Sequence, residues 1–300
     1  MKKTVVSGGS GYVGRFLVEG LLAAGHAVTV LGRTPPGVGF FSVPVAFEQC
    51  DLAGGRISPA LFQSASFFVH AAFDHVPGKY RGGEGDDPDT FRRRNLNGSI
   101  ALFEAAKEAG VSRTVFLSSR AAYGTRPPGT WLDEADEAIP DTLYGEVKLA
   151  TETALTQLSD ENFQGVSLRV TGVYGPAAKG REHKWASLFA DYLAGRPIAP
   201  RAGTEVHGTD VAEAVRLVLE HPAVPPNLLN VSDILLDRHD LLAIVQELTG
   251  SLQPLSERAD TAAINAMRTD RLRALGWTPG GLPRLRTCIA ELLLGSETGR

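Results

Sequence analysis

A tyrosine and a lysine, Tyr144 and Lys148, stand four residues apart in a segment with helical character. On a helix this spacing places both side chains on the same face. An ammonium group beside a phenol favours the phenolate, and moving a tyrosine pKa from about 10 towards 7 takes about 4 kcal/mol of differential stabilisation. The pair predicts a tyrosine that acts as general acid and base. A charged pair on the surface of a helix is the alternative interpretation.

Two serines, Ser118 and Ser119, end the apolar run at residues 114–117. Such a run is typical of a strand buried on both faces of a parallel sheet. Sheets of this kind bind ligands at the carboxyl ends of their strands. A serine hydroxyl there can therefore donate a hydrogen bond to a substrate carbonyl while Tyr144 moves the proton.

A glycine-rich turn follows the β-branched run at residues 4–6 and precedes a segment with apolar residues at helical spacing. The spacing Gly-x-x-Gly-x-x-Gly permits a tight turn, close approach of backbone N–H groups to a pyrophosphate, and close packing of helix on strand. The N-terminus of the following helix attracts the same anion. We therefore predict a dinucleotide-binding turn made of Gly8, Gly9, Ser10, Gly11, Tyr12, Val13 and Gly14.

The residue after the second predicted strand, at 27–31, bears on the choice between NAD and NADP. A carboxylate there would bind the ribose hydroxyls of NAD, but the sequence has Arg33. A guanidinium group makes bidentate hydrogen bonds to a phosphate, so Arg33 favours NADP, with NAD as the other cofactor to consider. A solvated arginine is the alternative interpretation. Asp51 and Leu52 follow a third predicted strand, and Asp51 either contacts the adenine edge or forms an Asx turn.

Strand and helix patterns alternate along the first part of the chain, with further strands at 66–72, 114–119 and 166–170 and helices at 96–109 and 144–158. Repeated units of this kind predict an α/β fold with a doubly wound parallel Rossmann sheet. The alternation becomes irregular after residue 176. We therefore expect an NAD(P)-binding domain at 1–170 and a smaller C-terminal α/β substrate lobe at 171–300, partly interleaved with it. Two long irregular segments, 73–89 and 125–142, leave strand ends where a substrate would bind.

The composition is that of a soluble globular protein, with 300 residues, 43% hydrophobic and 21% charged side chains, and a formal net charge of −4. Acidic and basic residues are interspersed, which argues against nucleic acid as a partner. No apolar stretch is long enough to suggest a membrane span. Two cysteines, Cys50 and Cys288, without a CxxC spacing fit a reducing cytoplasm. The seven histidines show no metal-ligand spacing, so no catalytic metal is expected.

These motifs together resemble the extended short-chain dehydrogenase/reductases, the group that contains nucleotide-sugar epimerases and dehydratases. The resemblance extends over nearly the whole chain. Its most specific segments are residues 7–14, 69–72, 95–99, 116–124, 144–148, 168–176, 206–212 and 275–279.

The resemblance implies roles for individual residues. Tyr144 is expected to be the catalytic acid and base, and Lys148 to bind the nicotinamide ribose and lower the pKa of Tyr144. Ser119 is expected to be the catalytic hydroxyl, with Ser118 the less favoured of the two serines. Asn95 is expected to be a supporting fourth member of the catalytic set.

Other residues have less definite interpretations. The motif with His70, Ala71 and Ala72 is expected to lie near the cofactor, although a structural role is favoured for the histidine side chain. The run from Arg92 to Arg94 faces either an anionic substrate or solvent. The resemblance also implies a homodimer through the helices at 96–109 and 144–158. Candidates for substrate specificity are His183, Lys184, Trp185 and His207.

Three residues depart from the pattern of nucleotide-sugar members. Those members usually carry an asparagine at the position of Gly172 and an arginine near that of Glu205, and both groups hold a nucleotide diphosphate. They also commonly retain NAD, whereas Arg33 favours NADP. We therefore expect an NAD(P)-dependent oxidoreductase that transfers hydride between nicotinamide and a carbonyl or alcohol of a small or sugar-like substrate. The alternatives are a nucleotide-sugar epimerase or dehydratase with retained NAD, and a non-catalytic NADP-binding sensor.

Overall fold

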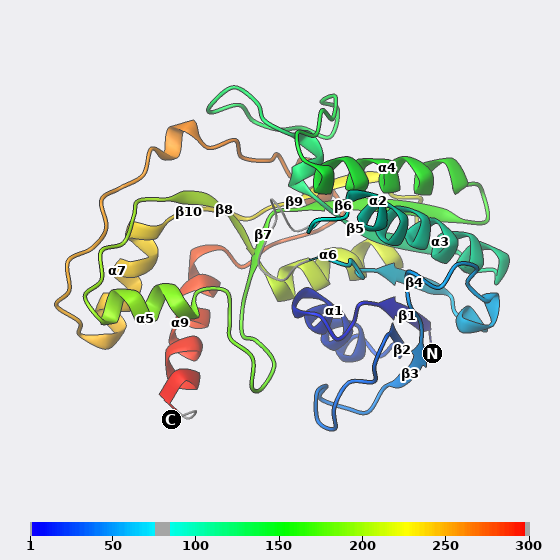
Figure 1. Cartoon of the computed structure of the whole chain (residues 1–300), viewed down its shortest axis with the longest axis horizontal. Coiled ribbons are helices and arrows are strands. Elements are labelled where there is room, and N and C mark those ends of the chain that lie inside the picture. Colours follow the sequence, from blue (N-terminus) through cyan, green and yellow to red (C-terminus); the bar gives the residue numbers. More distant parts are fainter. Residues whose placement is uncertain (1, 76–84, 298–300) are drawn as a thin grey trace.

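The computed structural model describes residues 2–75 and 85–297 of the chain. A large sheet covered by helices on both faces lies beside a smaller sheet with helices of its own (Figure 1). No helix within these described ranges is long and apolar enough to cross a membrane.

The large sheet has seven parallel strands in the order β3-β2-β1-β4-β5-β6-β9. Its central strands are buried on both faces: the successive residues Val5 and Val6 of β1 point to opposite sides and neither has exposed surface. The doubly wound Rossmann sheet expected from the sequence is confirmed. Its strands are β1 (Lys3–Ser7), β2 (Ala27–Gly32), β3 (Ala46–Gln49), β4 (Phe67–His70), β5 (Arg113–Ser119), β6 (Gln164–Val170) and β9 (Leu228–Val231).

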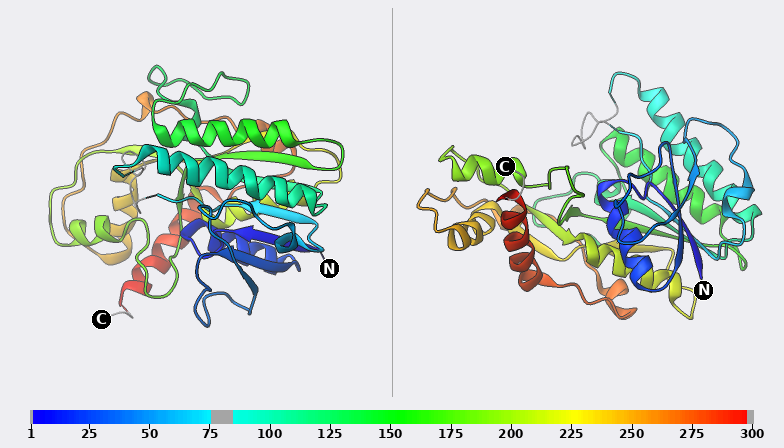
Figure 2. Two further views of the ribbon diagram at one scale, coloured as in Figure 1. Left: turned by 45° about the vertical axis from the view of Figure 1, so that its right-hand side comes forward. Right: turned by 90° about the horizontal axis from the view of Figure 1, so that it is seen from below.

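Helices cover both faces of this sheet (Figures 1 and 2). On one face, α1 (Tyr12–Ala23) and α6 (Gly208–Glu220) pack over β-branched side chains such as Val30 and Val115. On the other face, α3 (Gly98–Glu108) and α4 (Leu143–Leu158) pack over Phe68 and Phe116. The helix expected from residue 96 begins at Gly98, because Arg93–Asn97 form a π-helical turn after the short helix α2 (Pro88–Arg92).

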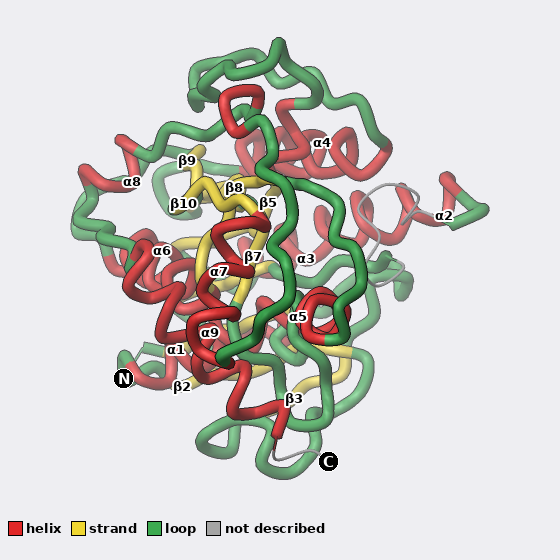
Figure 3. The backbone as a smooth tube through the Cα atoms, turned by 90° about the vertical axis from the view of Figure 1, so that its left-hand side faces the viewer, coloured by secondary structure: helices red, strands yellow, loops and turns green. Residues whose placement is uncertain are grey.

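A smaller sheet, in the order β10-β8-β7, forms the second part of the structure. Its strands are β7 (Gly172–Tyr174), β8 (Ala202–His207) and β10 (Ile234–Asp237). Three helices pack around it, and Figure 3 views the molecule from this side: α5 (Ala186–Leu193), α7 (Arg238–Thr249) and α9 (Gly281–Glu297). The chain after residue 171 also returns to the large sheet, since β9 pairs with β6, α6 packs on α1, and α8 (Asp270–Ala274) joins the same core.

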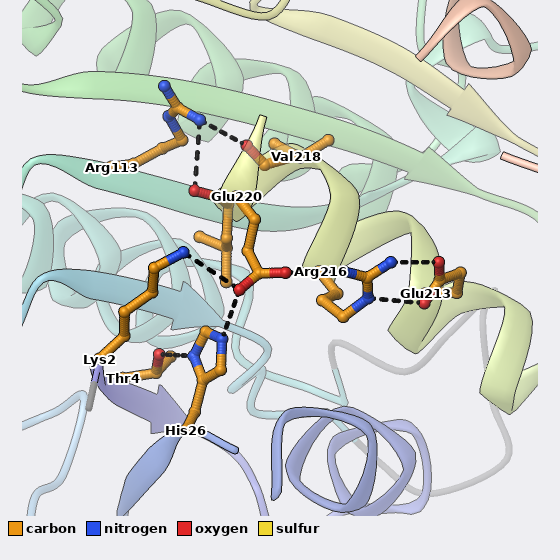
Figure 4. Close-up of polar contacts among 9 residues, drawn as sticks. Lys2, Thr4, His26, Arg113, Glu213, Arg216, Val218 and Glu220 are labelled. Atoms are coloured by element: carbon orange, nitrogen blue, oxygen red, sulfur yellow. Dashed lines mark hydrogen bonds and ion pairs between the residues drawn. The ribbon is translucent and has the colours of Figure 1, made fainter. Parts of the chain in front are cut away.

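A polar cluster ties the amino-terminal edge of the large sheet to the end of α6 (Figure 4). Glu220 Oε1 accepts a hydrogen bond from Lys2 Nζ at 3.1 Å and lies 3.1 Å from His26 Nε2. Arg216 donates to the other carboxylate oxygen at 2.6 Å, and His26 Nδ1 shares a hydrogen bond with Thr4 Oγ1. Partial burial raises the pKa of Glu220, but the hydrogen bonds from His26, Arg216 and Lys2 outweigh it and lower the pKa to about 2.

We expect Glu220→Gln to lower the free energy of unfolding by about 2 kcal/mol near neutral pH, because the ionised carboxylate stabilises the folded state. This contribution is fully present above the unfolded-state pKa of 4.5 and is lost as the pH falls towards 2. Urea unfolding at pH values from about 7 to about 3 measures the free energy of unfolding of both proteins, and the difference in this free energy between wild type and variant should become smaller below pH 4.5. Glu213→Gln, which removes a more exposed partner of Arg216, is the control; the same pH dependence in both variants would contradict the assignment.

Candidate active site

The glycine-rich turn between β1 and α1 is packed too closely to admit side chains. Gly8 has a φ of +73°, and a Cβ there would lie 2.5 Å from the backbone nitrogen of Ala72. A Cβ on Gly14 would lie 2.0 Å from the Gly8 carbonyl oxygen, which accepts a hydrogen bond from Gly11 at 2.9 Å. Among the described residues, no side chain caps α1, and its first turn carries no carboxylate. The first N–H groups of α1 are therefore available to an anion, which fits the pyrophosphate of a dinucleotide.

The remaining residues of the turn connect it to the rest of the molecule. A Cβ on Gly9 would lie 3.0 Å from Val18, so this glycine also packs closely. The Tyr12 hydroxyl donates to the carbonyl of Gly175 at 2.7 Å, which links the turn to the segment after β7. Val13 packs on the core beneath α1, and the carbonyl of Ser10 accepts a hydrogen bond from Arg181.

Three of the expected cofactor residues follow β2 and β3. Arg33 comes directly after β2 and its side chain is 68% exposed, with Nη1 3.6 Å from Asp74 Oδ1. Arg94 donates to the other oxygen of Asp74 at 2.7 Å. Asp51 accepts a hydrogen bond from the backbone N–H two residues further on at 3.0 Å, so the Asx turn is present, while Leu52 packs against the α3 core. Contact of Asp51 with adenine stays a prediction.

The His70 side chain is fully buried and links strands to a helix. Its Nδ1 shares a hydrogen bond with Ser7 Oγ at 2.6 Å and its Nε2 with Ser99 Oγ at 2.7 Å. Burial, assisted by the charge of Lys148, lowers the pKa of His70 to about 3, so the ring is neutral. The ring therefore has a structural position and no surface to offer a cofactor. The backbone of the next two residues, Ala71 and Ala72, packs on Gly8 and remains the part of this motif expected to face the dinucleotide.

Asn95 lies buried in the π-helical turn and fixes the segment that follows β4. Its Oδ1 accepts a hydrogen bond from the Asp74 N–H at 2.6 Å, and its Nδ2 donates to the carbonyls of Asp74 at 2.8 Å and Phe91 at 3.1 Å. Turns of this kind are frequent at functional sites. Asn95 therefore supports the site through the backbone of Asp74.

The two serines at the end of β5 have different partners, as expected for successive strand residues that point to opposite faces. The Ser118 hydroxyl donates to Glu152, which also forms a buried ion pair with Arg169 at 2.7 Å. Ser119 is half-buried, and its Oγ accepts a hydrogen bond from the Ala121 N–H at 3.1 Å at the start of a short 3₁₀ turn. Ser118 thus belongs to a buried network, which leaves Ser119 as the better candidate for contact with a substrate.

The turn after Ser119 meets the start of α4 at Gly145. A Cβ on Gly145 would lie 2.5 Å from the Ala121 carbonyl oxygen, so only glycine permits this approach. Thr142 Oγ1 caps the helix by accepting from the Gly145 N–H at 3.1 Å. Because Tyr144 precedes Gly145, the close contact brings the first turn of α4 next to the Ser119 turn.

The Lys148 ammonium is buried among aromatic rings, one turn along α4 from Tyr144. Its Nζ donates to a backbone carbonyl of β5 at 2.7 Å. The same Nζ lies 4.1 Å from the ring centre of Phe73, 4.7 Å from that of Phe116 and 5.7 Å from that of Tyr144. Burial lowers the pKa of Lys148 to about 7. The protonated form of Lys148 lies close enough to the Tyr144 ring to favour the tyrosine phenolate.

An ion pair between Lys184 and Glu205 lies against Gly172 at the start of β7. Gly172 and Glu205 are register partners in β7 and β8. A Cβ on Gly172 would lie 2.6 Å from Lys184 Nζ and 2.7 Å from Glu205 Oε2. The positive charge of Lys184 beside Gly172 is therefore neutralised by the carboxylate of Glu205.

The other specificity candidates have structural partners. The His207 ring caps α6 by accepting from the Thr209 N–H and packs edge-on against Phe16. Burial, assisted by Arg284, lowers the pKa of His207 to about 4. Trp185 stacks on a tyrosine ring 5.0 Å away, and burial lowers the pKa of His183.

Phe73, Asp74 and Glu152 carry no motif that singles them out in the sequence, although all three surround the expected site. Phe73 covers Lys148, Asp74 binds two arginines, and Glu152 binds Ser118. Their positions in the sequence, next to predicted site residues, could have identified them as candidates. Phe73 and Asp74 directly follow the Ala71-Ala72 motif, and Glu152 lies four residues after Lys148 on the same helix face.

Comparison with known proteins agrees with this arrangement. Residues 4–232 match the model of the NAD dependent epimerase/dehydratase family. The chain is 31% identical over 214 residues to a UDP-glucose 4-epimerase from Lacticaseibacillus casei. The aligned region covers 68% of this chain and 62% of that protein, which is less than two thirds of its length. It is 28% identical over 317 residues to dTDP-6-deoxy-L-talose 4-dehydrogenase (NAD(P)(+)) from Kitasatospora kifunensis, covering 99% of this chain and 96% of that enzyme.

Solved structures of similar fold were also found. A UDP-glucose 4-epimerase from Thermus thermophilus in complex with NAD is 28% identical, with a TM-score of 0.77 over 97% of this chain and 98% of that one. A UDP-glucose 4-epimerase from Thermotoga maritima with UDP-glucose, 21% identical, shares the fold with a TM-score of 0.81 over 98% of this chain and 99% of that one. The chain therefore belongs to the NAD dependent epimerase/dehydratase family of enzymes, within the extended short-chain dehydrogenase/reductases.

Proposed function

We propose that this chain is an NADP-preferring oxidoreductase that interconverts a carbonyl and an alcohol on a small or sugar-like substrate. The observation that carries the proposal is Tyr144 on the first turn of α4, next to the Ser119 turn and one helical turn from the buried Lys148 ammonium. A general acid, a cation that stabilises its conjugate base and a hydroxyl donor are the groups that carbonyl reduction needs.

The side chains divide the proton chemistry between them. A dinucleotide bound at the glycine-rich turn supplies the hydride in reduction and accepts it in oxidation. As the substrate oxygen gains negative charge, Ser119 donates a hydrogen bond to it and the Tyr144 hydroxyl gives it a proton. The phenolate that remains is stabilised by the Lys148 ammonium. In the oxidation direction the phenolate takes the alcohol proton.

Two observations support this reading over a nucleotide-sugar activity. Arg33 at the end of β2 suits a 2′-phosphate. Glu205 matches the charge of Lys184 beside Gly172, so a diphosphate at this position would meet a carboxylate. The relative from Kitasatospora kifunensis is named as a dehydrogenase that uses NAD(P)+, which supports the class of reaction. Its named substrate is a dTDP-sugar, so this relative does not argue against a nucleotide-sugar substrate.

A nucleotide-sugar epimerase with retained NAD is the second candidate, because several similar proteins are UDP-glucose 4-epimerases. Tyr144 and Ser119 would serve that reaction equally well. Mass and ultraviolet analysis of cofactor released from the purified protein separates the two. Stoichiometric NAD would support the epimerase and contradict the NADP preference, whereas turnover that depends on added NADPH would support the oxidoreductase. The sensor alternative has no support, since the compared proteins are enzymes by name.

We also propose a homodimer formed through α3 and α4, which lie side by side on one outer face of the large sheet (Figure 1). Light scattering tests this, and a monomer at micromolar concentration would contradict it.

Cys50 and Cys288 are free thiols, which fits the reducing cytoplasm proposed as the location.

Replacing Tyr144 by Phe should lower turnover at least about 100-fold and leave dinucleotide affinity unchanged, because only the proton donor is lost. Steady-state rates with a panel of carbonyl and polyol substrates measure the first quantity, and fluorescence titration with NADPH measures the second. Tyr192→Phe, which removes a hydroxyl bound to a backbone carbonyl far from the site, is the control and should keep the wild-type rate. Unchanged turnover in Tyr144→Phe would reject the mechanism.

Replacing Glu205 by Gln should strengthen the binding of UDP about tenfold, because the Lys184 ammonium is then free to bind a phosphate. Calorimetry with wild type and variant measures the change. Glu182→Gln removes an exposed carboxylate two residues before Lys184 and should leave UDP binding as it is. If wild type already binds UDP as tightly as the variant, the ion pair does not exclude a nucleotide diphosphate.

A further inference from the structure

The Asp74 carboxylate lies between two guanidinium groups from different parts of the chain. Arg33, directly after β2, has its Nη1 3.6 Å from Oδ1, and Arg94, in the π-helical turn, donates from Nη1 to Oδ2 at 2.7 Å. Because both cations bind the same carboxylate, the pair is able to bind one small oxyanion.

Arg33 places one end of this cluster at the edge of the sheet where the adenosine half of a dinucleotide is expected to bind, while Asp74 follows β4. In a Rossmann sheet the ribose is held at the end of the second strand, which here is β2 and is followed by Arg33. The hydrogen bond to Asp74 raises the pKa of Arg94, and the charge of Asp51 adds to the shift.

The backbone holds the cluster in place independently of its charges. Asn95, next to Arg94, binds both the N–H and the carbonyl of Asp74, at 2.6 and 2.8 Å. The buried Nε of Arg94 has no acceptor in the part of the chain that the structure describes. The two guanidinium groups share the Asp74 carboxylate, and Asp51 adds a second negative charge that acts on Arg94. A phosphate carries more charge and more oxygens than a carboxylate and can therefore compete with Asp74 for the two cations.

We propose that Arg94 is a second ligand, beside Arg33, for the 2′-phosphate of NADP, and that Asp74 is a built-in competitor which this phosphate displaces. The proposal rests on the NADP preference proposed above. It adds Asp74, which no motif identifies, and Arg94, which belongs to the arginine run at residues 92–94. NAD has no 2′-phosphate and leaves the carboxylate in place. Discrimination then comes from exchange of one anion for another on the same pair of cations.

The test measures the binding of two fragments to the full chain by calorimetry: adenosine 2′,5′-bisphosphate, which carries the phosphate, and adenosine 5′-monophosphate, which lacks it. Wild type should prefer the bisphosphate. Arg94→Gln should weaken bisphosphate binding about tenfold and leave monophosphate binding unchanged, because one charge-assisted hydrogen bond is lost. Arg93→Gln changes the neighbouring arginine, whose side chain donates to Thr90, and should keep both wild-type affinities.

Asp74→Asn provides a test in the opposite direction. Removal of the competing charge should strengthen bisphosphate binding about threefold and leave monophosphate binding unchanged. A variant that loses affinity for both fragments would give Asp74 a purely structural role and overturn the proposal. Thermal unfolding of each variant verifies that it is folded at the temperature of the titration.

The outcomes separate this inference from the proposed function. If wild type binds both fragments equally, the NADP preference fails and the role of Arg94 fails with it. If wild type prefers the bisphosphate and only Arg33→Gln removes the preference, the proposed function stands and the role of Arg94 is overturned. Loss of the preference in both arginine variants, with a stronger preference in Asp74→Asn, supports the inference.

Discussion

The carboxyl edge of the large sheet depends on a contact between backbones that leaves no room for a Cβ atom. Gly8 presses on Ala72, and Gly14 presses on the carbonyl of Gly8. Because both glycines lack side chains, a turn of only four residues joins β1 to α1, and the first N–H groups of α1 are left without a side-chain cap. A side chain at either glycine would push the helix away from β4. Arg33, after β2, and Ser119, at the end of β5, lie on opposite sides of this turn, so its position decides how a bound dinucleotide would be placed between them.

Buried polar side chains form a second layer that holds the reactive groups. Asn95 grips the backbone after β4, His70 joins β1 and β4 to α3, and Glu152 joins Ser118 on β5 to α4. These three side chains act without contact with a substrate, because each one fixes the strand or helix that carries a residue of the expected site. Buried hydrogen bonds are costly to leave unmade, so such a layer makes the arrangement rigid.

Local patterns in the sequence predict the sheet, the glycine-rich turn and the helix with Tyr144, since the spacing of glycines and of apolar residues is decided within a few residues. The ion pairs of Asp74 could not be predicted, because they join segments that approach only in the folded chain. The π-helical turn around Asn95 is also hidden, since its sequence continues the helical pattern. The four-residue strand β9 is too short for periodicity to assign it to the large sheet. The hydrogen bond from Ser118 to Glu152 could not be predicted from the sequence either, and this bond is the physical reason to prefer Ser119.

The return of α6 and β9 to the large sheet has a consequence for how this chain can be divided. A chain cut after residue 170 would leave β6 as an open edge and would uncover the apolar face that Val211 and Val215 of α6 normally cover. Open edges and large apolar faces promote aggregation. Residues 1–170 are therefore not expected to fold as an independent domain. The smaller sheet is built from two stretches of chain, one between β6 and α6 and one after β9, and α9 packs on it from a third. It therefore cannot be removed or exchanged as one continuous segment.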